Sequence, residues 1–295
     1  MPSEAYQNLV TMLSAGRVTP ELPLDQARAG WDAMENMLPG ADAVTIDDGV
    51  LGGRPARWLT AGDGGRKVGV HLHGGGYVIG SSKSHTPFGS HLAAALGGRV
   101  VIPDYRLAPE HTAPAAIEDA LSVYRELLDD GVSPADVVLT GDSAGGGLAL
   151  ALAIQLRDTG MPLPGSVSMI SPWADATGDY PSMRTKLDED IILSPELLAY
   201  WGGLYAGGLP LDDTRVSPAL GDLAGLPPLH IQVGTREVLL GDATQLADRA
   251  SAAGVDVRLE VCDDMIHIWP VLGAGVVPEA QDAIERMAGF ASSRA

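Results

Sequence analysis

Short runs of apolar residues, each bounded by glycine, proline or charged turn residues, recur along most of this chain. Their length and their content of β-branched side chains are typical of β-strands. The pattern predicts eight strands, at 43–48, 54–60, 67–72, 99–103, 136–140, 166–171, 229–233 and 255–261.

Amphipathic helical patterns separate most of the later runs. One face of 115–128 gathers Ile117, Leu121, Tyr124 and Leu128 at helical spacing. Strands that alternate with helices favour an α/β fold with a mostly parallel sheet. The first two strands have no helix between them and should form an antiparallel edge. The predicted helices are at 86–96, 114–130, 144–159, 238–253 and 278–292.

Two segments interrupt this alternation. Residues 1–40 precede the first strand and show short helical patterns at 4–14 and 24–37. Residues 173–228 separate the sixth strand from the seventh by more than one crossover helix requires, and they include an amphipathic stretch at 195–206. Long connections in compact domains are often lids or binding elements. We therefore interpret 173–228 as a lid in preference to a surface elaboration without function.

Composition and charge exclude several classes of protein. The chain has 38 acidic and 19 basic residues, a formal charge of −19, which argues against a nucleic-acid binder. A hydrophobic content of 45% argues against disorder, and the single cysteine, Cys262, excludes a disulfide scaffold. The longest apolar stretch, 148–156, is too short for a membrane span, and the N-terminus lacks the pattern of a signal peptide. We expect a soluble, cytoplasmic protein without membrane insertion.

The strongest chemical signal is the G-x-S-x-G motif at 141–145, directly after a predicted strand and directly before a predicted helix. In that context the glycines permit a sharp turn that lifts the hydroxyl of Ser143 above the carboxyl end of the sheet. The backbone N–H of Ala144, at the start of the helix, would then point at an oxyanion on the attacked carbonyl. The motif predicts Ser143 as a nucleophile.

A second motif, His73-Gly74-Gly75-Gly76, ends the strand at 67–72. Consecutive glycines allow close backbone approach and free their N–H groups, so the loop would complete an oxyanion hole with Ala144. No G-K-[ST] ending follows, so a phosphate loop is excluded. His73 is interpreted as a loop organiser. His71 and His73 share one face without further ligands, so no metal site is expected.

A serine nucleophile needs a base and an orienting acid, which follow it in chain order on this kind of sheet. His267 lies in the loop after the last strand and is predicted to be the base. Glu237, four residues past the seventh strand, is the favoured acid; Asp242 is the alternative, although its expected role is to cap the following helix. Asp142 is expected to fasten loops. His230 and Cys262 are interpreted as packed side chains.

Several segments together resemble the hormone-sensitive-lipase-like α/β-hydrolases, in their bacterial carboxylesterase branch. They are HGGGYVIGS at 73–81, DYRLAPEHTAPAAIEDA at 104–120, GDSAGG at 141–146, RVSPAL at 215–220, GLPPLHIQVG at 225–234 and MIH at 265–267. The resemblance runs from about residue 60 to the C-terminus. It implies an α/β-hydrolase fold, with a helical cap inserted in one catalytic domain that spans 1–295. The cap would combine residues 1–40 with about 173–228.

The resemblance also implies an activity. It points to a serine carboxylesterase that hydrolyses short-chain esters through an acyl-enzyme, with a Ser143–His267–Glu237 triad and no metal or cofactor. The charge of −19, which would repel anionic esters, adds the expectation of neutral substrates. Gly75 and Gly76 would donate to the oxyanion with Ala144. The family also implies a small-molecule ester as partner and, through its last strand and helix, pairing into a homodimer. Three aromatic side chains are expected to line the substrate pocket, with core packing as the alternative: Tyr77, Trp201 and Tyr205.

The sequence is also compatible with other activities. Glu237 stands where the family commonly has aspartate, and Asp264 and Ile268 stand where it has glycine, so the loop geometry and the acyl pocket wall are expected to differ. A lactone hydrolase, a deacetylase or an amidase would use the same acyl-transfer machinery. A non-catalytic small-molecule receptor on the same scaffold is the alternative of another class, disfavoured because serine, histidine and acid are all present.

Overall fold

The computed structural model describes residues 1–14, 16 and 19–293, which form a sheet of eight strands covered by helices. The strand order is β1-β2-β4-β3-β5-β6-β7-β8, with β2 antiparallel to both neighbours and all other pairs parallel. The predicted mostly parallel sheet with an antiparallel first pair is confirmed. The strands are β1 (Val44–Leu51), β2 (Arg54–Ala61), β3 (Val68–Leu72), β4 (Arg99–Pro103), β5 (Val137–Asp142), β6 (Ser166–Ile170), β7 (Leu229–Gly234) and β8 (Val257–Cys262).

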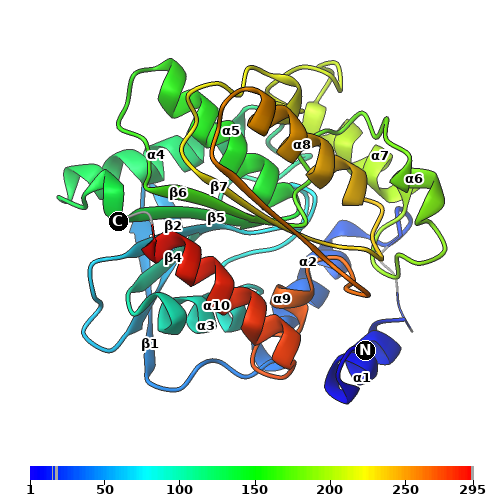
Figure 1. Cartoon of the computed structure of the whole chain (residues 1–295), viewed down its shortest axis with the longest axis horizontal. Coiled ribbons are helices and arrows are strands. Elements are labelled where there is room, and N and C mark those ends of the chain that lie inside the picture. The colour runs from blue at the N-terminus through cyan, green and yellow to red at the C-terminus, as the bar shows by residue number, and fades with distance from the viewer. Residues whose placement is uncertain (15, 17–18, 294–295) are drawn as a thin grey trace.

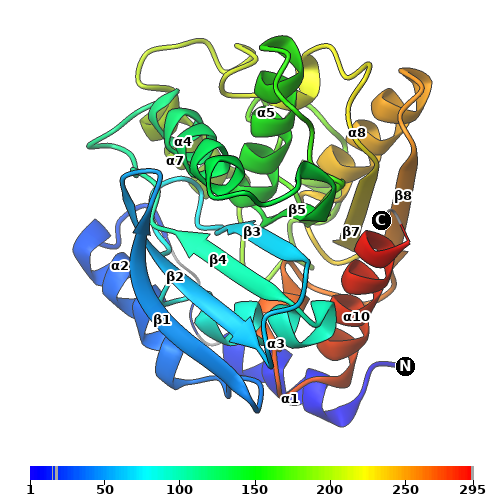
Figure 2. The same ribbon diagram turned by 90° about the vertical axis from the view of Figure 1, so that its left-hand side faces the viewer.

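Helices cover both faces of the sheet. Helices α4, α5 and α8 lie on one face and α3, α9 and α10 on the other (Figure 1). The β1–β2 hairpin forms one edge of the sheet (Figure 2), and β8 forms the other. The helices are α1 (Glu4–Leu13), α2 (Leu24–Asp32), α3 (Thr86–Leu96), α4 (Ala115–Asp129), α5 (Ala144–Asp158), α6 (Ser182–Thr185), α7 (Pro195–Ala206), α8 (Leu240–Ala252), α9 (Trp269–Leu272) and α10 (Pro278–Ser292), with 3-10 turns η1 (Ala33–Asn36), η2 (Pro134–Asp136) and η3 (Pro218–Leu220).

Differences from the predicted elements have local causes. Strand β1 extends three residues beyond the predicted end, up to the turn at Gly52 and Gly53, whose φ angles of 60° and 71° suit glycine. The helix predicted at 24–37 ends at Asp32 and tightens into the 3-10 turn η1. The two-residue delay at the start of β8 follows Gly254, where φ is 82°.

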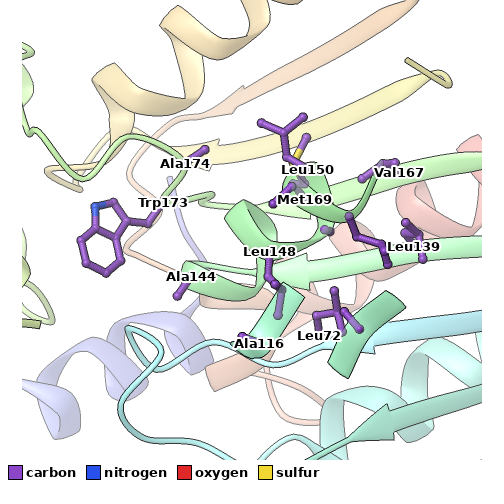
Figure 3. Close-up of a cluster of buried hydrophobic side chains, with 14 of the residues drawn as sticks. Leu72, Ala116, Leu139, Ala144, Leu148, Leu150, Val167, Met169, Trp173 and Ala174 are labelled. Carbon is purple, nitrogen blue, oxygen red and sulfur yellow. The ribbon is translucent and has the colours of Figure 1, made fainter. Parts of the chain in front are cut away.

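The central strands and α5 form the core that supports the chemistry. All residues of β3 and β5 are buried, as expected for parallel strands covered on both faces. Side chains from β5, β6 and α5 meet those of Trp173 and Ala174 in one apolar cluster (Figure 3). A Cβ on Gly145 would lie 1.9 Å from the carbonyl oxygen of Leu72, so only glycine lets α5 approach β3 this closely.

The two segments that interrupt the α/β alternation supply α1, α2 and η1, and α6, α7 and η3. Helices α2 and α7 lie at the same end of the sheet (Figure 1). Residues 15, 17 and 18 of the first predicted cap segment fall outside the described residues. Across the part of the chain that the structure describes, no helix is both long and apolar enough to cross a bilayer.

Candidate active site

Ser143 stands at the sharp turn between β5 and α5. Its φ of 53° and ψ of −123° are strained for a residue with a side chain. The turn is tight because Gly141 and Gly145 flank it: a Cβ on Gly141 would meet the Gly145 carbonyl oxygen at 2.2 Å. The backbone carbonyl of Ser143 accepts from Gly146 and Gly147. The geometry is that of a strand–turn–helix elbow that presents a serine hydroxyl.

His267 and Glu237 are brought together from the loops after β8 and β7. Nδ1 of His267 lies 2.8 Å from Oε2 of Glu237, and both side chains are buried. Burial alone would lower the pKa of His267, but the hydrogen bond and charge of Glu237 raise it overall. With Nδ1 engaged by the carboxylate, Nε2 is the ring nitrogen left for chemistry.

Ser171, which was not among the predicted site residues, contacts both Glu237 and the backbone next to His267. Its hydroxyl donates to Oε1 of Glu237 at 2.8 Å and accepts from the N–H of Ile268 at 3.2 Å. Oε1 also accepts from the N–H of Gly234 at 2.6 Å, so both carboxylate oxygens of Glu237 are used. The one available signal was its position directly after β6, the neighbour of the strand that Ser143 follows.

Asp242, the alternative acid, binds backbone N–H groups of another segment. Its Oδ2 accepts from the N–H groups of Ala174 at 2.7 Å and Asp175 at 3.0 Å, which fastens the start of the 173–228 segment to α8. The predicted capping role is wrong, because Leu239 occupies the N-cap of α8 and Asp242 lies within the helix. Burial raises the pKa of the Asp242 carboxyl well above its ordinary value, which favours the neutral form.

A small cavity joins the predicted catalytic groups. Its volume is about 20 Å³, and Ser143, His267, Gly75 and Gly76 all contribute to its wall. Apolar side chains from the two interrupting segments close it: Trp31, Ile192, Leu193, Leu197, Leu198 and Trp201. Only Trp201 among these was predicted from the sequence, because the other side chains are aliphatic or lie in segments without a motif.

Tyr77 and Tyr205 are not part of this wall. Their rings stack on each other with centroids 3.7 Å apart, and the Tyr205 hydroxyl is directed to the carbonyl oxygen of Arg215 at 3.4 Å. The pair packs behind the cavity in the apolar core. The expectation that these two tyrosines line the pocket is corrected in favour of Trp31 and the leucines of α7, which are large apolar groups at the same end of the sheet.

The glycine loop at 74–76 has unused N–H groups on two residues that line the cavity. Gly75 and Gly76 have φ angles of 109° and 62°, and neither N–H donates to an acceptor among the described residues. A Cβ on Gly76 would lie 2.1 Å from the ring of Trp201, so the loop and α7 are in direct contact. Ala144, the first residue of α5, contributes the N–H that follows Ser143. These are the groups predicted as an oxyanion hole.

A buried polar cluster of Asp142, His71 and His85 supports the glycine loop. Oδ1 of Asp142 accepts from the N–H of Gly74 at 2.9 Å and lies 3.2 Å from Nε2 of both His71 and His85. Burial opposes ionisation of Asp142, but the two histidines lower its pKa overall. The ring of His73 stacks on Tyr105, and its Nδ1 lies 2.8 Å from the carbonyl oxygen of Gly74. Asp142 and His73 thus occupy the fastening positions expected of them.

Among the described residues, this cluster comes nearest to a set of metal ligands. Potential ligand atoms of His71, His85 and Asp142 lie within 4.8 Å of one another. Each residue already has protein partners, since His71 Nδ1 lies 3.0 Å from the Thr140 hydroxyl and His85 Nδ1 2.9 Å from that of Ser84. An N–H donor on the carboxylate is also a poor neighbour for a cation. We assign the cluster the bracing role.

Two further residues stand apart from the cavity. His230 is buried within β7, where its ring stacks on Phe290 and its Nε2 lies 3.2 Å from Oε1 of Glu260. Cys262, at the end of β8, is half-buried rather than fully buried, and burial raises the pKa of its thiol. A raised pKa disfavours the reactive thiolate.

Known proteins resemble this chain in both sequence and fold. A protein-family model for the alpha/beta hydrolase fold matches residues 69–271. An acetyl-hydrolase of Streptomyces hygroscopicus is 41% identical over 93% of this chain and 90% of its own length. An esterase of Acinetobacter venetianus is 34% identical over 89% and 86%. The crystal structure of an esterase from the bacterial hormone-sensitive lipase family has a TM-score of 0.94 at 40% identity, covering 100% of this chain and 99% of the other. The expected fold is confirmed.

Proposed function

This chain belongs to the bacterial hormone-sensitive lipase family of α/β-hydrolases, and on that premise we propose that it cleaves short, neutral carboxylic esters with a Ser143–His267–Glu237 triad. It is a carboxylic ester hydrolase, like the esterases among its relatives. The observation that supports the proposed triad best is the 2.8 Å contact of Glu237 with His267, whose side chain lines the same cavity as Ser143.

In the proposed mechanism the Ser143 hydroxyl attacks the ester carbonyl while Nε2 of His267 takes its proton. Glu237 holds the imidazole in the working tautomer and stabilises its cation. The tetrahedral oxyanion accepts hydrogen bonds from the N–H groups of Gly75, Gly76 and Ala144. The C–O bond to the alcohol then breaks as His267 returns the proton to the leaving oxygen. Water activated by the same histidine releases the acid from the acyl-enzyme.

Covalent labelling tests this proposal directly. A fluorophosphonate probe should label the wild-type protein with one equivalent, and mass spectrometry should place the adduct on Ser143, because phosphonylation needs the same nucleophile and base. Prior treatment with a small carboxylic ester should slow the labelling by competition. An unlabelled but folded protein would contradict the proposed activity and favour the receptor alternative.

The size of the cavity supports a short acyl group. Its volume is only about 20 Å³, so a long acyl chain would require its apolar walls to move apart. A second, apolar cavity of about 270 Å³ lies beyond Trp31 and Ile192, which line both cavities. These two side chains therefore form the partition that limits the space available next to Ser143. The name of the Streptomyces relative, an acetyl-hydrolase, agrees with a small acyl group.

Removing this partition should change the preferred chain length. In Trp31→Ala the two cavities should merge, so the ratio of kcat/KM for p-nitrophenyl octanoate to that for the acetate should rise by about tenfold or more. Trp58→Ala is the matched control, because Trp58 lies on β2, where the guanidinium of Arg99 lies over its ring, and it does not line either cavity. An unchanged ratio in Trp31→Ala would show that the acyl chain lies elsewhere.

Charge supports the neutral character of the proposed substrate. The formal charge of −19 creates a field that repels anions from the protein surface. The described wall of the small cavity contains no Asp, Glu, Lys or Arg side chain that could pair with a charged acyl or alcohol group. A charged substituent would lose its hydration there without gaining a partner.

We also propose that residues 1–40 and 173–228 act together as a cap on the catalytic domain. The support is that Trp31 of α2 lines the same cavity as Ser143 and as Leu197, Leu198 and Trp201 of α7. Lactones, amides and acetylated compounds would use the same proposed triad, and the apolar side chains of the wall offer no hydrogen-bonding group that favours them over simple esters.

A further inference from the structure

The hydroxyl of Tyr6 reaches from α1 into the loop that precedes His267. It donates to the carbonyl oxygen of Asp264 and accepts from the N–H of Ile266, both at 2.8 Å. The two bonds lie on either side of Met265 and end one residue before His267. Tyr6 is 1% exposed, although α1 lies in the N-terminal segment that precedes the first strand. The N-terminal segment thus contacts the backbone of the loop at 263–268, the histidine loop, which joins β8 to α9.

The histidine loop needs such support because its backbone is strained. Asp264 and Ile268 have φ angles of 63° and 47°, in the left-handed region that favours glycine. For a β-branched residue such as Ile268 this conformation is rare, and it persists only where the surroundings enforce it. Three hydrogen bonds to residues that follow β6 and β7 help to enforce it. The N–H of Asp264 donates to Thr235 Oγ1, the N–H of Ile268 donates to Ser171 Oγ, and the carbonyl of Met265 accepts from the N–H of Arg236.

Helix α1 is itself anchored, so Tyr6 is held in place. The Ser3 hydroxyl donates to Oε2 of Glu279 in α10 at 2.8 Å and accepts from the N–H of Tyr6 at 3.1 Å. Helix α1 packs beside α10 (Figure 2). Burial raises the pKa of Tyr6 to about 12, so the hydroxyl keeps its proton and remains a donor at neutral pH.

We propose that Tyr6 is a positioning residue for the reaction: its two hydrogen bonds fix the 264–266 backbone and thereby aim Nε2 of His267 at Ser143. This inference rests on the proposed triad. It means that the N-terminal segment contributes to catalysis as well as to the cavity wall. The effect reaches the chemistry through His267 alone, since Tyr6 does not line the cavity.

The test is Tyr6→Phe, which removes one oxygen and keeps the ring. Because small misplacements of a reacting group can cost up to about 100-fold in rate, kcat for p-nitrophenyl acetate should fall by about 10- to 100-fold, with KM within about twofold. The rate constant for fluorophosphonate labelling of Ser143 should fall by a similar factor. Tyr124→Phe is the matched control: that buried tyrosine also donates to a backbone carbonyl, of Pro162, but belongs to α4. It should keep the wild-type kcat.

Folded Tyr6→Phe protein with wild-type kcat and labelling rate would overturn the proposal, as would an equal loss in Tyr124→Phe. If Tyr6→Phe does not fold, Ser3→Ala serves instead, because it loosens α1 without touching the loop. It should lower kcat in the same direction by a smaller factor, and wild-type kcat in Ser3→Ala would then overturn the proposal. Failure of the triad itself is distinguishable, because the wild-type protein would then resist labelling.

Discussion

Ser143→Ala should abolish almost all hydrolysis of p-nitrophenyl acetate, with kcat falling by about 10⁴- to 10⁶-fold. The residual rate would come from the oxyanion donors and substrate binding, which persist when a triad member is removed. KM should change little, because the substitution removes one oxygen and leaves the other lining groups of the cavity in place. The measurement is steady-state kinetics at high enzyme concentration, corrected for spontaneous hydrolysis.

Ser168→Ala provides a matched control for this result. Ser168 is also a buried serine, on β6, and its hydroxyl has no hydrogen-bond partner among the described residues. It should keep wild-type kcat and KM. Retention of more than about 1% of the wild-type kcat in Ser143→Ala would exclude Ser143 as the sole nucleophile, since removing a nucleophile costs far more than that. Water activated directly by His267 would then be the mechanism to examine.

The positions of Ser143 and His267 were predictable because each depends on local sequence. A G-x-S-x-G motif between a buried strand and a buried helix allows one geometry, and the parallel order of β5, β7 and β8 brings the loops after these strands to one edge of the sheet. The fold was predictable for the same reason: alternation of apolar runs with amphipathic helices restricts the topology.

The cavity wall and the supports of the loop were not predictable from local sequence. Trp31, Ser171 and Tyr6 lie in segments without a motif. Two of them act through hydrogen bonds to residues more than 65 positions away in sequence: Tyr6 with Ile266 and Ser171 with Glu237. The pocket prediction favoured Tyr77 and Tyr205 because aromatic side chains near the motifs were the only visible signal. Their stacking on each other depends on how α7 packs, which no local pattern encodes.

The two candidate acids show how structure separates residues that the sequence leaves close together. Glu237 and Asp242 lie five positions apart, and both are fully buried. Glu237 contacts the imidazole of His267, whereas Asp242 contacts two backbone N–H groups of another segment. Because burial raises the pKa of Asp242 well above its ordinary value, its carboxyl is poorly suited to stabilise an imidazolium.

Glu237→Gln should therefore lower kcat by about 10³- to 10⁴-fold, since an amide keeps the size of the side chain but loses the charge that supports the imidazolium. A second signature should appear in the pH profile of kcat/KM. His267 acts as a base only when neutral, and Glu237 raises its pKa. The acid limb of the profile should consequently move to lower pH in Glu237→Gln.

Asp242→Asn is the discriminating partner of that variant. Asparagine keeps a carbonyl oxygen for the N–H groups of Ala174 and Asp175, so kcat should stay within about tenfold of wild type and the acid limb should not move. A larger loss in Asp242→Asn than in Glu237→Gln would assign the acid to Asp242. It would also require the α8 end of the loop to rearrange before catalysis, because Glu237 is the carboxylate that contacts Nδ1 of His267.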